Sequence, residues 1–332
     1  MSFIDLIKSR AKSNPKTIVL PEAYDKRVLT AANQVLSEGI AKIILIGSKD
    51  EITKNAEGMD LSKAVFIDPR TYDKSEEYVN QLFELRKSKG MTLEEAGKLI
   101  YEDELYFGIM LVKTGVADGM VAGAVRSTPD VLSPCVRVLK TSPNSKIVSS
   151  VFVMCVPDCQ YGHNGIFVYG DCGMNQNPDA ETLAYIAVNS AKTFKSLVGA
   201  EPVVAMLSNS TMGSTKNDDV QKVVDATKIA KEMAPDIIID GEFQADAAIV
   251  KEIGNQKAPG SAVAGNANVL IFPDLQSGNI GYKLTERLAK ASAYGPVTAG
   301  IAKPVNDLSR GCTADDIIGV VAITAVQAHN PL

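Results

Sequence analysis

The stretch TIVLPEAYDKRVLTAANQVLSEGIAKIILIG, residues 17–47, decides the fold class of this chain. Thr17–Pro21 is a short apolar run that predicts a buried strand, and an amphipathic helical pattern follows it through Leu36. Gly39 ends that helix, and Ala41–Gly47 is a second apolar run with the length of a strand. Strands that are apolar on both faces and alternate with a helix indicate a parallel sheet covered by helices.

The same alternation continues along the rest of the chain. Further strands are predicted at 64–67, 120–124, 147–156, 166–169, 203–208, 237–240, 268–272 and 297–301. Further helices are predicted at 74–88, 92–113, from about Thr128, and at 180–198, 218–234, 278–290 and 313–328. We therefore expect an α/β protein with mostly parallel sheets and helices on both faces of each sheet.

A length of 332 residues is typical of about two domains. The turn-rich stretch Thr141–Lys146 (TSPNSK) is the predicted boundary, and Tyr294–Pro296 is a second break in the pattern. If the last strand and helix return to the first domain, the chain crosses twice and leaves a cleft between the domains. The expected limits are then 1–143 plus 297–332 for a discontinuous α/β domain I, and 144–296 for an α/β domain II.

Composition and charge argue against several classes of protein. The chain has 45% hydrophobic and 22% charged residues, as ordinary globular proteins do. Its formal net charge is -5 and it lacks a basic patch, so we expect no nucleic-acid partner. Apolar runs are too short to span a membrane, and the first residues lack the apolar segment of a signal peptide. We therefore expect a cytoplasmic protein without a membrane partner.

Several familiar sites are missing from the sequence. Its 5 cysteines and 2 histidines lack the paired spacing of a zinc site, so we expect reduced thiols and no bound metal. The GxGxxG, GxxxxGK[ST] and GxSxG patterns are absent, which removes the usual support for dinucleotide, nucleotide and Ser-His-Asp chemistry. Anionic substrates must then be bound by a few arginines and backbone amides.

The sequence KPVNDLSRGCTADD, residues 303–316, holds the best candidate site. Ser309 and Arg310 come just before the last predicted helix, where a guanidinium and unpaired first-turn amides suit an oxyanion. Asp316 lies in the first turn of that helix and could accept a proton from a thiol or hydroxyl. A second interpretation stays open, because Thr313 and Asp316 also fit a capping box and Arg310 fits a surface ion pair.

Two weaker candidates lie in the second half of the chain. The segment 208–215 (SNSTMGST) follows an apolar strand, so its amides and hydroxyls could bind a phosphate, although an ordinary hydrophilic loop has the same composition. The cysteines of Cys155–Cys159 (CVPDC) could line a site, although buried thiols are usually inert.

A long ordered series of motifs resembles the phosphotransacetylases, the phosphate acetyl/butyryltransferase family. The matching segments are VPDC (156–159), MLSNST (206–211), DGEFQADAA (240–248), PDLQSGNI (273–280) followed by YK, YGP (294–296) and KPVNDLSRG (303–311). They occur in the order of the family over nearly the whole chain, which is more specific than any single motif.

This resemblance implies a homodimer of two-domain subunits, each with a fold like that of isocitrate and isopropylmalate dehydrogenases. It also implies an active site in the interdomain cleft and a first domain that includes the C-terminal segment. The implied reaction is acetyl-CoA + phosphate ⇌ acetyl phosphate + CoA. Coenzyme A, acetyl phosphate and phosphate would be small-molecule substrates, with no tightly bound cofactor and with stimulation by a monovalent cation.

The resemblance also implies roles for individual residues. Asp316 matches the base that takes the proton of the coenzyme A thiol, so that the thiolate attacks acetyl phosphate directly in a ternary complex. Ser309 matches the serine that holds the thiol or the oxyanion, and Arg310 the arginine that neutralises the departing phosphate. Cys159 would be a neighbour of the site rather than a nucleophile. The family segments that contain Ser208, Ser210 and Thr211 make these residues substrate-binding candidates.

Arginines would bind the phosphates of coenzyme A. Arg27, Arg86 and Arg287 match arginines of the family. One departure is Ser133, where the family has arginine before a proline. Arg137 lies one helical turn further on, and we expect it to replace the missing charge.

Three alternative functions share parts of this pattern. A phosphate butyryltransferase would use the same chemistry on a longer acyl chain. A non-catalytic domain that senses acyl-CoA or acetyl phosphate would not need Ser309, Arg310 and Asp316 together. A nicotinamide-dependent dehydrogenase of the related fold would need an acidic metal cluster, for which only Asp236, Asp240 and Asp246 are candidates.

Overall fold

The computed structural model describes residues 2–329, which form two compact units. Unit 1 consists of residues 2–142 together with 301–329, and unit 2 consists of Pro143–Gly300. Residue 1 and residues 330–332 of the expected domain I lie outside the described residues. The domain limits expected from the sequence, at 143/144 and 296/297, stay a prediction.

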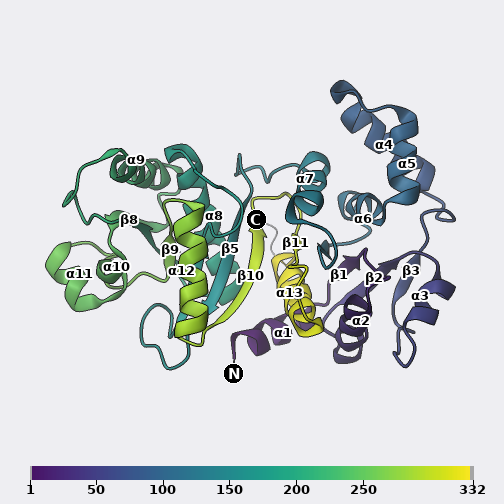
Figure 1. Cartoon of the computed structure of the whole chain (residues 1–332), viewed down its shortest axis with the longest axis horizontal. Coiled ribbons are helices and arrows are strands. Elements are labelled where there is room, and N and C mark those ends of the chain that lie inside the picture. The colour runs from purple at the N-terminus through teal and green to yellow at the C-terminus, as the bar shows by residue number, and fades with distance from the viewer. Residues whose placement is uncertain (1, 330–332) are drawn as a thin grey trace. The chain divides into compact units, whose positions relative to one another are not determined.

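A parallel five-stranded sheet forms the centre of unit 1 (Figure 1). Its neighbouring strands are all parallel and lie in the order β11-β4-β1-β2-β3. These strands are β1 (Thr17–Leu20), β2 (Lys42–Ile46), β3 (Val65–Ile67), β4 (Gly119–Ala122) and β11 (Val305–Asp307). Because they run in one direction, the loops that follow them all leave from the same edge of the sheet. The C-terminal segment supplies the edge strand β11 beside β4.

Helices cover both faces of this sheet. Helices α2 (Lys26–Glu38) and α13 (Ala314–Gln327) pack against one face, and α6 (Glu104–Lys113) and α7 (Thr128–Leu139) pack against the other (Figure 1). Helix α1 (Phe3–Ser13) packs on α13. The other helices of unit 1 are α3 (Lys49–Asn55), α4 (Ser75–Arg86), the short 3-10 helix η1 (Lys87–Lys89) and α5 (Leu93–Glu102).

The sequence of α2 explains where this helix begins and ends. The side chain of Asp25 accepts a hydrogen bond from the amide of Arg27 and so caps the N-terminus. Gly39 adopts the left-handed conformation at the C-terminus, with a φ of 68°. Val28 and Leu29 are buried on the face that meets the sheet. The strand, helix and strand predicted for residues 17–47 are confirmed.

The prediction of one helix over residues 92–113 is wrong. Asp103 has an extended conformation and separates α5 from α6. Its side chain accepts a hydrogen bond from the amide of Leu105 at 2.9 Å and thereby caps α6. The apolar pattern continues across Asp103, so periodicity alone does not reveal this break. Helix α3 and strand β11 were not predicted either. The helix has only about two turns and the strand only a few residues, so neither shows a clear apolar period.

Unit 2 has a six-stranded sheet in the order β10-β5-β6-β9-β7-β8. Strands β6, β9, β7 and β8 are parallel, whereas β5 runs antiparallel to both β6 and β10. The strands are β5 (Ser149–Cys155), β6 (Ile166–Gly170), β7 (Val203–Leu207), β8 (Ile238–Phe243), β9 (Val269–Ile271) and β10 (Ser292–Ala299). The expectation of mostly parallel sheets is confirmed, with two antiparallel pairs in this unit.

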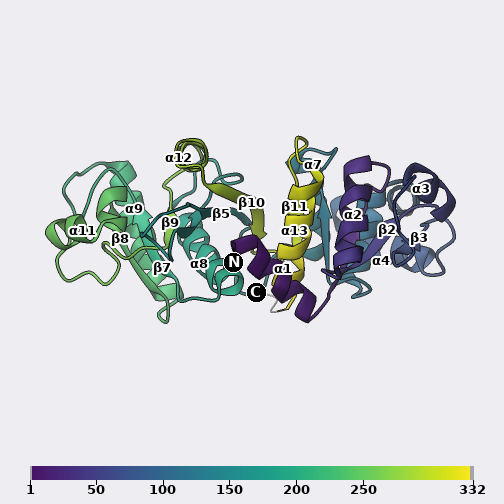
Figure 2. The same cartoon turned by 90° about the horizontal axis from the view of Figure 1, so that it is seen from below.

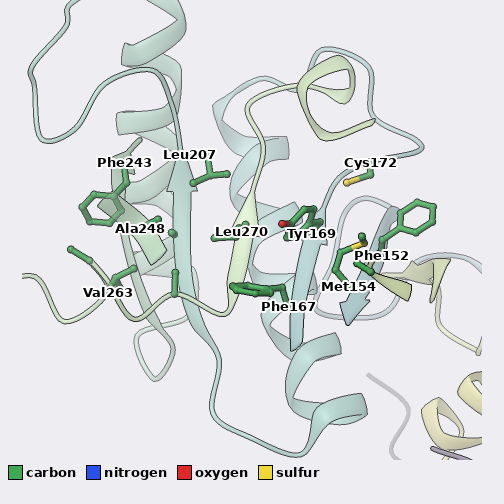
Figure 3. Close-up of a cluster of buried hydrophobic side chains, with 14 of the residues drawn as sticks. Phe152, Met154, Phe167, Tyr169, Cys172, Leu207, Phe243, Ala248, Val263 and Leu270 are labelled. Atoms are coloured by element: carbon green, nitrogen blue, oxygen red, sulfur yellow. The ribbon is translucent and has the colours of Figure 1, made fainter. Parts of the chain in front are cut away.

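Helices α8 (Ala180–Val198) and α12 (Leu275–Leu288) cover opposite faces of the unit 2 sheet (Figure 2). Helices α9 (Asp218–Met233), α10 (Ala245–Ile249) and α11 (Lys251–Lys257) complete the unit. Part of the core is a cluster around Phe152, Phe167 and Tyr169, shown in Figure 3. The cluster contains mostly apolar side chains from β5, β6, β7 and β9, so it holds these strands to the helices around them.

Gly278 is the buried residue of α12. A Cβ atom at this position would lie 2.5 Å from the carbonyl oxygen of Asp171, which follows β6. Only glycine therefore lets this helix approach the end of β6 so closely. Among residues 2–329, none of the helices combines the length and the apolar character needed to cross a bilayer.

Candidate active site

Residues 308–313 join β11 to α13 and contain the candidates Ser309 and Arg310. Leu308 is buried, whereas Ser309, Arg310 and Gly311 are exposed. The Oγ atom of Ser309 accepts a hydrogen bond from the amide of Gly311 at 3.2 Å, and its carbonyl accepts one from the amide of Cys312 at 2.9 Å. These bonds close a tight turn from which the side chain of Arg310 reaches solvent.

Asp316 forms a capping box with Thr313 at the start of α13. Its Oδ2 atom accepts hydrogen bonds from the amide and from the hydroxyl of Thr313, each at 2.8 Å. The amide of Asp316 donates in return to Oγ1 of Thr313 at 3.2 Å. The capping geometry is therefore confirmed, and Oδ1 is the oxygen that remains for a substrate proton. The role of Asp316 as a base stays a prediction.

Arg27 links this turn to the loop that follows β4. Its Nη1 atom donates to the carbonyl oxygens of Arg310 at 2.8 Å and of Cys312 at 3.0 Å. Its Nη2 atom donates to the carbonyl of Ala124, in the loop after β4, at 2.8 Å. Nε and Nη2 also donate to the two carboxylate oxygens of Asp25, at 3.1 and 2.8 Å. The structure thus brings Arg27, Ser309 and Arg310 together within unit 1.

Glu22, two residues after the end of β1, holds the loop that follows β4. Its side chain is buried, with 1% exposure, and its Oε2 atom accepts hydrogen bonds from the amides of Gly123 at 2.9 Å and Ala124 at 2.8 Å. Strands β1 and β4 flank the point where the strand order of the sheet reverses. Open α/β sheets generally bind ligands outside the carboxyl ends of their strands at such a point. The fold therefore favours a site at the loops that follow β1 and β4, to which Arg27 ties the turn of Arg310.

Asp307, the last residue of β11, is a second buried carboxyl at this edge, with 1% exposure. Its Oδ2 atom accepts a hydrogen bond from Thr128, while Oδ1 has no partner among the described residues. A Cβ atom on Gly123 would lie 2.2 Å from this Oδ1, so only glycine fits against the carboxyl. Burial raises the pKa of Asp307 to about 6; the hydrogen bond from Thr128 opposes this rise and the charge of Glu22 adds to it.

Arg86 and Arg137 lie on other elements of unit 1. Arg86 is the last residue of α4, and Arg137 is an exposed residue in the last turn of α7. Ser133 lies on α7 one turn before Arg137, so the two side chains share a face of the helix. Within the described residues, neither arginine is hydrogen-bonded to Ser309, Arg310 or Asp316. Their part in substrate binding stays a prediction.

A cavity of about 450 Å³ lies at the carboxyl ends of β1, β2 and β3, and none of the candidate residues lines it. Its charged lining is one guanidinium, Arg70, and four carboxylates, Glu51, Asp68, Glu102 and Glu104. This balance of charge is unfavourable for a ligand that carries several phosphates. The cavity is therefore a poor site for the phosphate groups of a coenzyme.

In unit 2, Ser208, Ser210 and Thr211 follow β7 as expected, but their loop is closed by a carboxylate. Oε1 of the buried Glu242 accepts hydrogen bonds from Oγ of Ser210 at 2.7 Å and from the amide of Gly213 at 2.8 Å. Most other amides of the loop donate within it or to β8, namely those of residues 208, 210, 211, 212, 214 and 215. Any contact with a phosphate would therefore come from hydroxyl groups rather than from these amides.

The remaining candidates of unit 2 are Cys159 and Arg287. Cys159 is partly buried and packs against the cluster of Figure 3. Burial raises the pKa of the nearby Cys155 to about 12, so that thiol is not ionised at neutral pH. Arg287, in the last turn of α12, has an 80% exposed side chain whose Nε lies 3.8 Å from Glu286.

Comparison with known protein families gives a match over nearly the whole chain. Residues 2–325 match the family described as phosphate acetyl/butaryl transferase. The chain belongs to this family. It is 60% identical, over 99% of both chains, to a phosphate acetyltransferase of Acetivibrio thermocellus. It also superimposes on the crystal structure of a phosphotransacetylase from Streptococcus pyogenes with a TM-score of 0.93 and 43% identity, over 99% of each chain.

The fold of the phosphate acetyl/butaryl transferase family extends to dehydrogenases. A 4-hydroxythreonine-4-phosphate dehydrogenase from Klebsiella pneumoniae matches with a TM-score of 0.54 over 95% of this chain, at 10% identity. At this identity the likeness concerns the fold alone. The expected family and the expected dehydrogenase-like α/β fold are both confirmed.

The sequence of this phosphate acetyl/butaryl transferase family member did not lead us to predict Glu22 and Asp307 as parts of the candidate site. Glu22 comes directly after an apolar segment in the sequence TIVLPE, and Asp307 ends the short segment PVND. A charged residue next to a buried strand was the sequence feature that could have identified them, because a buried carboxylate needs hydrogen-bond partners. Which partners it finds is decided by strand order, and the partners of Glu22 lie 101 and 102 residues away.

Asp307 gives the stability of the protein a characteristic dependence on pH. Its folded pKa, about 6, lies above the unfolded value of 3.8. The folded chain therefore binds a proton that the unfolded chain has lost, and stability falls as the pH rises between these values. We expect the free energy of unfolding of wild type, measured with urea and relative to Asp307→Asn, to be about 2 kcal/mol smaller at pH 7.5 than at pH 4. An equal difference at both pH values would contradict this.

Proposed function

We propose that this chain is an acyltransferase that exchanges an acetyl group between phosphate and coenzyme A. The observation that carries the proposal is its 60% identity, over 99% of both chains, to a phosphate acetyltransferase, together with the turn that presents Arg310 beside the first turn of α13. The alternatives of a butyryltransferase and of a sensing domain have no such support.

In the proposed reaction coenzyme A and acetyl phosphate bind together. Asp316 takes the thiol proton, and the sulfur forms a bond to the acetyl carbon while the bond from that carbon to the phosphate oxygen breaks. The products are acetyl-CoA and phosphate, and the proton passes from Asp316 to water or phosphate. A free thiol has a pKa near 8.5, so a positioned base increases the reactive fraction at neutral pH.

Arg310 would neutralise the departing phosphate, and Ser309 would hold the thiol or the oxyanion. The guanidinium of Arg310 is exposed, and its planar donors match phosphate oxygens. The first amides of α13 contribute less, because Thr313 and Asp316 bond each other's amides in the capping box. Charge neutralisation at this turn therefore depends on the Arg310 side chain more than on the helix N-terminus.

Asp316→Asn separates the base from the cap. The amide oxygen of Asn still accepts the hydrogen bonds from Thr313, but it does not take a thiol proton at neutral pH. We expect kcat for thioester formation to fall by about 100-fold or more, the usual contribution of a general base, while the free energy of unfolding changes by about 1 kcal/mol or less. Thioester absorbance with acetyl phosphate and coenzyme A measures the rate.

Asp315→Asn is the matched control, because Asp315 is an exposed carboxylate in the same helical turn without a part in the capping box. We expect this variant to keep the wild-type rate. An Asp316→Asn enzyme with wild-type kcat would reduce Asp316 to a helix cap.

We propose that Arg86, Arg137 and Arg287 bind the phosphates of coenzyme A, with Arg137 in place of the arginine that the family has at Ser133. The support for Arg137 is local: α7 is helical from Thr128 to Leu139, so residues 133 and 137 lie one turn apart on one face.

We expect Arg137→Ala to raise KM for coenzyme A about tenfold with little change in kcat, because it removes one charged hydrogen bond of about 1.5 kcal/mol. The double variant Ser133→Arg with Arg137→Ala should recover most of the lost affinity. Arg70→Ala removes an exposed guanidinium of the same unit and serves as control. Steady-state kinetics measure all three, and an unchanged KM in Arg137→Ala would remove this residue from the binding site.

In unit 2 we propose Cys159 and the hydroxyl residues Ser208, Ser210 and Thr211 as further neighbours of the substrates. Ser210 is fully buried and already donates to Glu242, so its part would be to fix the loop. Ser208 is only partly buried and is the hydroxyl of this set best placed to reach a ligand.

We propose that the protein is a homodimer and that α12 supplies part of its interface. Ile280, Leu284 and Leu288 follow one another at intervals of four residues and are 58%, 52% and 80% exposed. A helix with this spacing presents them as one apolar stripe. Exposed apolar stripes of this kind are typical of protein interfaces. Because the resemblance implies a homodimer, a second copy of the chain is the partner that we assign.

We expect Leu284→Glu to raise the dissociation constant of this dimer about 100-fold, because it introduces an unpaired charge into an apolar contact at a cost of about 3 kcal/mol. Sedimentation velocity over a range of concentrations measures the shift. Val65→Glu is the control, since Val65 is also 52% exposed but lies on β3 of unit 1. A Leu284→Glu protein that sediments like wild type would exclude α12 from the interface.

Two further features belong to this proposal. We propose a cytoplasmic location, because reduced thiols are typical of that compartment and the cysteines of the described residues are free. Stimulation by a monovalent cation is implied by the resemblance and stays a prediction for this chain.

A further inference from the structure

The guanidinium group of Arg27 has no N–H left for a substrate. An arginine side chain offers five N–H donors. In this chain they meet five acceptors, which are two oxygens of Asp25 and the carbonyl oxygens of Ala124, Arg310 and Cys312. A guanidinium binds a phosphate through parallel N–H donors on one edge, and here each edge is already engaged.

These contacts join the start of α2 to two loops at the carboxyl edge of the unit 1 sheet. Arg27 belongs to the first turn of α2, Ala124 follows β4, and Arg310 precedes α13. The three residues whose carbonyl oxygens accept from Arg27 lie 97, 283 and 285 positions away in sequence. Ala124 is held from both sides, since its amide donates to Glu22 and its carbonyl accepts from Arg27.

Asp25 sets the orientation of the Arg27 guanidinium. It accepts the Arg27 amide as the cap of α2 and two side-chain N–H groups of the same residue. The hydrogen bonds from Arg27 keep the pKa of the Asp25 carboxyl below its usual value, so the pair stays charged. A guanidinium fixed in this way holds the backbone of Arg310 and Cys312 in one position.

We propose that Arg27 is a positioning residue for the transfer reaction and not a ligand of coenzyme A. By holding the carbonyl oxygens of Arg310 and Cys312, it fixes the turn from which the Arg310 side chain and Ser309 act. This inference rests on the proposed acetyl transfer, and it replaces the role that the resemblance implied for Arg27.

Arg27→Lys tests this role, because an ammonium keeps the charge but cannot bridge three carbonyl groups and a carboxylate. We expect kcat for thioester formation from acetyl phosphate and coenzyme A to fall at least about tenfold, as small displacements of catalytic groups do. We expect KM for coenzyme A to change less than about twofold, because no coenzyme contact is lost. A raised KM with unchanged kcat would instead identify Arg27 as a ligand of coenzyme A.

A double-mutant cycle with Arg310→Ala distinguishes positioning from general damage to the fold. If Arg27 acts through Arg310, then Arg27→Lys lowers kcat about tenfold in wild type and less than about twofold in the Arg310→Ala background. An equal loss in both backgrounds would overturn the proposal. Lys26→Gln removes the neighbouring exposed charge and should leave kcat and KM unchanged.

The wild-type assay separates this inference from the proposed function. If wild type forms no acetyl-CoA, the proposed function fails. If wild type is active and Arg27→Lys equals it in kcat and KM, only the positioning role fails.

Discussion

Both sheets depend on buried carboxylates that bind the backbone amides of loops at the ends of their strands. Glu22 follows β1 and binds the amides of Gly123 and Ala124. Asp171 follows β6 and binds three amides of the turn at residues 173–175, and Glu242 in β8 binds the amide of Gly213. Each carboxylate is at most 3% exposed, so both it and its amides would be costly to bury unpaired. The need to pair these carboxylates with backbone amides therefore determines the shape of the loops in both units.

This arrangement determines how the protein can bind anionic substrates. In many α/β proteins, amides at strand ends and helix N-termini bind phosphate directly. Here the protein's own carboxylates engage such amides at Glu22, Asp171, Glu242 and the Asp316 cap. Positive charge must therefore come from side chains. Because the donors of Arg27 are engaged by the protein itself, the exposed guanidinium of Arg310 becomes the main source of charge at this turn.

Long apolar runs made most of the fold predictable from the sequence. Helix α8 and the strand–helix–strand unit at 17–47 were predicted with nearly their observed bounds, because their patterns are long and have clear caps. The break at Asp103 was missed because periodicity runs across it. In the candidate site, Ser309, Arg310 and Asp316 were identified from one contiguous segment. The contacts of Glu22, Arg27 and Asp307 were not, since they join residues about 100 or more positions apart through strand order that no local pattern encodes.

The return of the chain to unit 1 sets the order in which the protein can fold during synthesis. The first 142 residues leave the ribosome without β11 and α13, so one edge of β4 is unpaired and the apolar surface under α13 is open. Translation of Pro143–Gly300 takes about 8–30 s at the usual rates of about 5–20 residues per second. Throughout that interval the nascent N-terminal part exposes a strand edge and apolar side chains, which are the features that chaperones recognise and that lead to aggregation.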